Sequence, residues 1–227
     1  MNPKLRNTVA GLGIVGSALF PVKEAVTQSI DVSNYTGKYM FWAVPFSEKI
    51  VNQPSISTNY KNFSTWTMVN FDPDKGVNEF DFLGDVSIPL NSKVNLSAGA
   101  VYFPSKINGK WEHAANLYTR ADFNVPLSPS VVFNKLVGNC SGHYIATSLS
   151  KNFKVGKNLT ANVSGELGYN DNAFIDGRGF SHVETKATLP INKGRFTFSP
   201  FVSNIKSFIR GIENRKYGGV NLNYNFR

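Results

Sequence analysis

The last eight residues, VNLNYNFR at positions 220–227, alternate strictly between apolar and amide side chains until the final arginine. Val220, Leu222, Tyr224 and Phe226 occupy one set of positions, and asparagines fill the gaps between them. Successive side chains of a strand point to opposite faces, so this pattern predicts a β-strand with one apolar and one polar face. Chain ends are usually poorly ordered. A strand here therefore implies neighbours that hold it on both sides.

The same period-two pattern recurs along the chain after residue 28. Phe80, Phe82 and Ile88 share one face of a segment whose other face carries Asp81 and Asp85. We expect twelve strands, near residues 29–44, 53–60, 63–70, 78–89, 93–103, 112–125, 130–134, 143–153, 159–169, 181–190, 195–205 and 217–226. Segments 63–70 and 130–134 have mixed faces, so ten strands remain an alternative.

These segments have the length of membrane-spanning strands. They run to about 10 residues, whereas strands of soluble proteins average about 5 to 6 and a tilted spanning strand takes ~9 to 11. No apolar run approaches the ~20 residues that a spanning helix needs. Charged residues make up only 17% of the chain. The expected fold class is therefore all-β, a transmembrane antiparallel up-and-down β-barrel.

A sheet that spans a membrane must close into a barrel, because hydrocarbon offers no hydrogen-bond partner to the backbone groups of an open sheet edge. The last strand must then pair with the first, which makes Val220, Leu222, Tyr224 and Phe226 the barrel-closing strand. The connections also alternate in length. We expect long ones near 45–52, 71–77, 104–111, 135–142, 170–180 and 206–216, and short ones near 61–62, 90–92, 126–129, 154–158 and 191–194. This order is typical of bacterial outer-membrane barrels with both chain ends in the periplasm.

The amino terminus has the pattern of an export signal. Lys4 and Arg6 precede an uncharged, apolar stretch at residues 8–20, which matches a basic region followed by a hydrophobic region. We expect a signal peptide at residues 1–25 and the barrel at residues 29–227. A short buried helix is the alternative.

Charge and cysteine usage exclude several classes of protein. The net charge is +9, but lysines and arginines are spread through the connections rather than clustered on a helix, so no nucleic-acid partner is predicted. Cys140 is the single cysteine and cannot form an intramolecular disulfide. His113, His143 and His182 accompany many serines without a nucleophile elbow, so the chain is not predicted to be an enzyme, and no cofactor is expected.

One segment has the residue types of a calcium loop. The stretch DPDKGVNEFD at residues 72–81 offers Asp72, Asp74 and Asn78 as oxygen ligands. Gly76 stands where an EF-hand loop has its third ligand, so a turn with solvated carboxylates is the favoured interpretation.

The polar faces of the strands are expected to line the lumen. Strand parity places these charged side chains there: Glu79, Asp81, Asp85, Arg120, Asp122, Glu166, Glu184 and Lys186. A basic loop is expected at the pore mouth, where it would concentrate anions: Lys206, Arg210, Arg215 and Lys216. The same inward charges could instead pair across the interior and close it.

Residues 37–60 resemble the first hairpin of the TorF-type porin family, in which an aromatic strand precedes a Gln-Pro-Ser segment. The matching residues are Gln53, Pro54, Ser55, Gly168, Tyr169, Asn170, Ser181, His182, Val183, Glu184, Leu189 and Pro190. Trp42 and Ala43 stand where an Arg-Gly pair is common in the family. The resemblance implies an outer-membrane protein that forms a pore.

The sequence thus predicts an outer-membrane barrel that passes small hydrophilic solutes by passive diffusion. Its expected partners are the lipid bilayer, the barrel-assembly machinery and those solutes, while the oligomeric state stays open. One alternative is a closed structural barrel that binds a surface partner through loops 170–180 and 206–216. A second alternative is a soluble exported β-barrel that binds an apolar ligand.

Overall fold

A computed structural model describes residues 26–226 except 37–39, 42, 43, 46, 48, 108, 157, 158 and 174. The predicted signal peptide at residues 1–25 lies outside the described residues, as do Trp42 and Ala43. Within the described part of the chain, no helix is long and apolar enough to cross a membrane.

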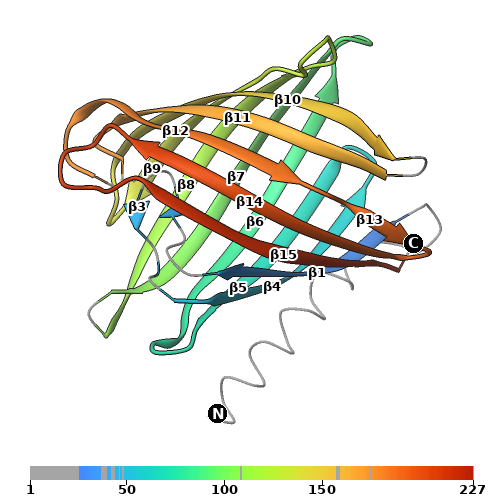
Figure 1. Cartoon of the computed structure of the whole chain (residues 1–227). Coiled ribbons are helices and arrows are strands. Elements are labelled where there is room, and N and C mark those ends of the chain that lie inside the picture. Colours follow the sequence, from blue (N-terminus) through green and yellow to red (C-terminus); the bar gives the residue numbers. More distant parts are fainter. Residues whose placement is uncertain are drawn as a thin grey trace.

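Twelve strands form the barrel wall (Figure 1). They are β1 (Thr27–Thr36), β4 (Val51–Tyr60), β5 (Phe63–Asp72), β6 (Gly76–Pro89), β7 (Val94–Ile107), β8 (Lys110–Phe123), β9 (Ser130–Gly138), β10 (Gly142–Gly156), β11 (Leu159–Asp171), β12 (Arg178–Thr188), β14 (Phe196–Ser207) and β15 (Arg215–Asn225). A short β13 (Ile191–Lys193) pairs with the start of β14. All twelve predicted segments correspond to wall strands, so the alternative of ten strands is wrong.

The wall closes on itself. Each strand pairs antiparallel with its neighbours in sequence, and β15 pairs with β14 on one side and with β1 on the other. The amide of Phe226 also donates to the carbonyl of Gln28 at 2.9 Å. The predicted closure is therefore confirmed, and both ends of the barrel sequence lie at one rim, called the terminal rim here (Figure 1).

The opposite rim, called the distal rim, carries the connections that follow β1, β5, β7, β9, β11 and β14. The first of them contains two short strands, β2 (Met40–Phe41) and β3 (Val44–Pro45), which pair with each other. The predicted strand at 29–44 therefore ends earlier, at Thr36.

The predicted alternation of connection lengths is wrong in detail. Predicted long connections at 71–77, 104–111 and 135–142 shrink to 73–75, 108–109 and 139–141. The strands continue past their apolar alternation because backbone pairing does not need apolar side chains, as the pairs Ser105 with Glu112 and Lys106 with Trp111 show. On the terminal rim, 124–129 and 189–195 are as long as several distal connections.

The buried side chains lie on the inner face of the wall. On β14, Ser199, Phe201, Ser203 and Ile205 are buried, whereas the alternating Val202 is 65% exposed. The same parity holds around the barrel, where large apolar side chains stand exposed on the outer face. In a membrane-spanning barrel this exposed apolar face contacts lipid.

Candidate functional site: the inner face of the barrel

One polar network of the inner face centres on two glutamates of β11 and β12. Glu166 and Glu184 are direct cross-strand partners and point the same way. Ser203 Oγ and Tyr217 OH donate to Glu184 Oε1 at 2.5 and 2.9 Å. Adjacent like charges destabilise a sheet, so these hydroxyl donors stabilise an arrangement that would otherwise be costly.

Glu166 is held from the other side by β10 and β12. Tyr144 OH donates to Glu166 Oε1 at 3.2 Å, and His182 Nε2 lies 3.6 Å from the same oxygen. The imidazole of His182 is stacked against the Tyr144 ring, and its Nδ1 lies 3.0 Å from Ser181 Oγ. A register shift after Gly168 turns both Ser181 and His182 inward. Hydroxyl groups therefore donate to both glutamates, and the His182 imidazole lies beside Glu166 as well.

Lys186 follows Glu184 on the inner face of β12 but contacts an aromatic ring. Its Nζ lies 4.4 Å from the centroid of Phe201, a favourable cation–π geometry. Phe201 packs in turn against Tyr35 and Tyr217, with ring centroids 5.6 and 6.2 Å away. This aromatic cluster joins β1, β14 and β15 across the seam where the barrel closes.

A second group of carboxylates lies on β6. Ser105 Oγ donates to Glu79 Oε2 at 2.6 Å, and Tyr118 OH donates to Asp85 Oδ2 at 2.7 Å. Asp81 Oδ1 is buried and has no hydrogen-bond partner among the described residues. The Tyr118 ring reaches Asp85 across Gly99, where a Cβ atom would lie 2.8 Å from the ring. Position 99 therefore requires glycine, because the Tyr118 ring passes too close to the backbone for any side chain.

Other inward charges are paired near the terminal rim. Arg120 Nη2 lies 2.6 Å from Asp122 Oδ1, although both side chains remain substantially exposed. Asn223 Nδ2 donates to Asp31 Oδ1 at 2.7 Å and Asn221 Nδ2 donates to Ser33 Oγ at 2.9 Å. The amides between the apolar residues of β15 therefore bond to β1 on the inner face.

Sequence reasoning omitted Asp31, Tyr118, Tyr144 and Tyr217 from the predicted lumen set. Asp31 and the three tyrosines lie an even number of residues from other inward side chains on their strands. The alternation along each strand therefore predicts that they point inward. The predicted residues of the closing strand, Val220, Leu222, Tyr224 and Phe226, alternate with the inward Asn221 and Asn223 at the closing seam.

The structure divides the predicted basic loop between two faces of the wall. Lys206 and Lys216 have the parity of the exposed residues and lie on the outer face. Arg215 pairs with the buried Ile205 and has the inward parity, and Arg210 is exposed in the distal connection 208–214. The four residues therefore do not form one basic ring, because neighbouring positions of a strand point in opposite directions.

The calcium candidates are not gathered into one site. Asp72 Oδ1 accepts the amides of Asp74 and Lys75, and its other oxygen accepts Ser47 Oγ at 2.9 Å. Asp74 forms an exposed ion pair with Lys49 at 2.8 Å. Asn78 is buried and its Oδ1 accepts Asn70 Nδ2 at 2.6 Å. Within the described ranges, no group of three His, Cys, Asp or Glu residues could hold a metal ion.

Several solved structures have a similar fold. KdgM porin superposes with a TM-score of 0.63 at 14% identity, covering 88% of this chain and 99% of that one. The COG4313 outer membrane channel from Pseudomonas putida F1 gives 0.58 at 8% identity, with 92% and 100% covered. NanC porin gives 0.56 at 9% identity, with 88% and 99% covered.

No protein-family model matches the sequence, and no curated protein matches it. At these low identities the structural matches show the fold. The closed wall, its exposed apolar outer face and its polar inner face define a transmembrane β-barrel with the fold of the outer-membrane porins that it matches.

Proposed function

We propose that the protein is a passive channel for small hydrophilic solutes and a member of the TorF-type porin family. The observation that carries the proposal is the contrast between the two faces of one closed wall. Hydroxyls, amides and carboxylates lie inside, and apolar side chains lie outside. Such a wall separates an aqueous bore from hydrocarbon.

The inward charges favour cations within the bore. Among the described residues, the inward carboxylates include Asp31, Glu79, Asp81, Asp85, Asp122, Glu166 and Glu184, and the inward bases include Arg120, Lys154, Lys186 and Arg215. Neutral donors hold most of these carboxylates, so their charge acts on passing ions. The bore therefore differs in sign from the whole chain, whose net charge is +9.

This charge pattern also limits the solutes. KdgM porin, which has a similar fold, has been solved in complex with disordered oligogalacturonate. Oligogalacturonate is a polyanion, and an acidic bore repels polyanions. We therefore assign neutral or cationic small solutes to this chain.

The remaining parts of the proposal concern biogenesis and chemistry. The signal peptide at residues 1–25 would direct export, and the barrel-assembly machinery would insert the chain through its terminal strand. No catalytic activity is part of the function proposed. The expected opening of the distal rim is toward the cell exterior.

Planar-bilayer recording tests the channel. Purified, refolded protein should give discrete current steps, and heat-modifiable gel migration should first establish that the barrel is folded. The matched variants are Ser148→Trp on the inner face and Thr147→Trp on the outer face of β10. The first should lower the step conductance, and the second should leave it unchanged.

A folded barrel without current steps would favour the closed structural alternative. One observation supports that alternative. Leu136 and Tyr144 are buried and pack with Ala146 and Ala173 in an apolar cluster near the distal rim. Such a barrel would act through the exposed connections of that rim.

A further inference from the structure

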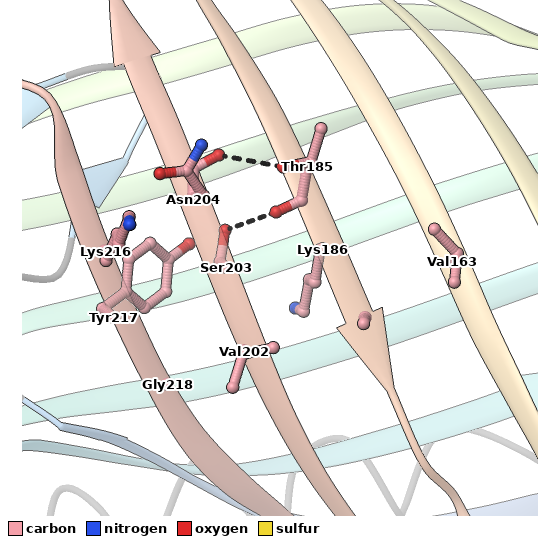
Figure 2. Close-up of a pocket in the computed structure, with 10 residues that line it drawn as sticks. Val163, Thr185, Lys186, Val202, Ser203, Asn204, Lys216, Tyr217 and Gly218 are labelled. Atoms are coloured by element: carbon pink, nitrogen blue, oxygen red, sulfur yellow. Dashed lines mark hydrogen bonds between the residues drawn. The ribbon is translucent and has the colours of Figure 1, made fainter.

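The outer wall is hollowed where β11, β12, β14 and β15 run side by side (Figure 2). The hollow has a volume of about 740 Å³. We call it the outer groove, and it is lined by Val163, Thr185, Lys186, Ala187, Val202, Ser203, Asn204, Lys216, Tyr217 and Gly218.

Strand register places the groove on the lipid-facing side. Val163 pairs with Ala187, Ala187 pairs with Val202, and Val202 pairs with Gly218, so these four residues form one row across the strands. Val163 and Val202 are 43% and 65% exposed. Ala187 and Gly218 have almost no side chain, so the outer surface of the wall is recessed at these two positions.

The distal end of the outer groove is polar and basic. The next row toward the distal rim consists of Thr185, Asn204 and Lys216. Lys206 follows Asn204 on the outer face of β14, with its Nζ 6.0 Å from the Phe208 ring. Among the described residues, neither lysine forms an ion pair.

We propose that the outer groove binds one molecule of lipid A, the phosphorylated glycolipid of the outer leaflet. The apolar row contacts an acyl chain, and Lys206 and Lys216 bind a phosphate at the level of the headgroups. Apolar contact below and positive charge above match the two parts of such a lipid. Seven of the ten lining residues have the outer parity, opposite to the bore, whereas Lys186, Ser203 and Tyr217 have the inner parity and lie between them along their strands.

The geometry favours this occupant over a second barrel. A barrel-to-barrel contact would bring the lysines of both copies together, and like charges repel. A phosphate instead supplies the missing charge, and an ammonium is a common phosphate ligand. An acyl chain also adapts to an irregular hollow, because its bonds rotate freely.

Native mass spectrometry of the refolded full chain titrated with purified lipid A tests the proposal. The wild type should retain one lipid A, and Lys206→Gln and Lys216→Gln should each weaken binding about fivefold. Ala187→Phe fills the floor of the groove without changing charge and should weaken binding as well. Lys135→Gln is the matched control, because Lys135 has the outer parity on β9 and lies away from the groove.

Phosphatidylglycerol and dephosphorylated lipid A provide the other arms, and heat-modifiable migration identifies folded variants. Both lipids should bind more weakly than lipid A. The assignment would be overturned if phosphatidylglycerol were retained as well as lipid A, or if Lys135→Gln weakened binding as much as Lys206→Gln or Lys216→Gln. It would also be overturned if the protein formed a dimer that the groove variants abolish.

Discussion

Tyr144 and Leu149 lie five residues apart on β10 and have opposite environments. The tyrosine is 1% exposed and points inward, whereas the leucine is 46% exposed and points outward. In a soluble protein the leucine would normally be the buried residue of such a pair. The reversal repeats around the barrel, which means that the solvent of the outer face is hydrocarbon and that the polar network belongs inside.

The largest expected effect comes from placing a charged side chain on the apolar outer face at the middle of β10. Leu149→Arg places a charge on the outer face at mid-strand and should lower the free energy of unfolding in lipid vesicles by about 2–4 kcal/mol. Ser150→Arg, one residue away on the inner face, should have a much smaller effect. Urea titration in vesicles measures both, and equal losses would contradict the assignment of faces.

The next effect compares packing on the two faces of β11. A Cβ on Gly168 would lie within 2.7 Å of Tyr144 OH, His182 Cε1 and Ser181 Oγ, so Gly168→Ala should cost about 1–3 kcal/mol. At Gly165 the nearest atom to such a Cβ is the Glu184 carbonyl oxygen at 3.8 Å. Gly165→Ala should therefore be nearly neutral in the same unfolding assay.

A smaller effect concerns ion preference. Glu166→Gln and Glu184→Gln each remove one inward negative charge, so the cation preference should fall in a reversal-potential measurement across a potassium chloride gradient. Lys135→Gln changes the charge of the outer face and should leave the reversal potential unaltered. Anion preference in the wild type would show that the inward carboxylates do not control the bore.

The smallest effect is a labelling rate at the distal rim. Cys140 lies between β9 and β10, and partial burial, together with the charge of Glu112, raises the pKa of its thiol. A raised pKa leaves less thiolate at neutral pH, so a membrane-impermeant maleimide should react slowly with intact cells and faster as the pH rises. Reaction only after disruption of the outer membrane would reverse the proposed orientation.

The alternation of apolar and polar residues was sufficient to predict the strands and their faces. Successive side chains of any strand point to opposite faces, so one rule applies to every position. The pairs Phe80 with Asp81 and Leu222 with Asn223 illustrate it. Connection lengths were not predictable from apolar alternation, since strand pairing continues where side chains become polar, as at Ser105 and Glu112.

The candidate site was less predictable than the fold. The same parity rule separates Lys216 from Arg215, so the division of the basic cluster was available in the sequence. The inward orientation of both Ser181 and His182 could not be predicted from the sequence, because it depends on a register shift between β11 and β12. The donors that hold Glu184 come from β14 and β15, and such long-range contacts leave no local pattern.

The orientation of the wall can be measured directly with spin labels. In a Cys140→Ser background, single cysteines introduced along β10 at Thr147, Ser148, Leu149 and Ser150 would carry a nitroxide in lipid vesicles. Labels at 147 and 149 should collide with lipid-soluble oxygen, and labels at 148 and 150 should collide with a water-soluble nickel complex. The opposite alternation, or nickel access at all four positions, would contradict a barrel with an apolar exterior and a polar bore.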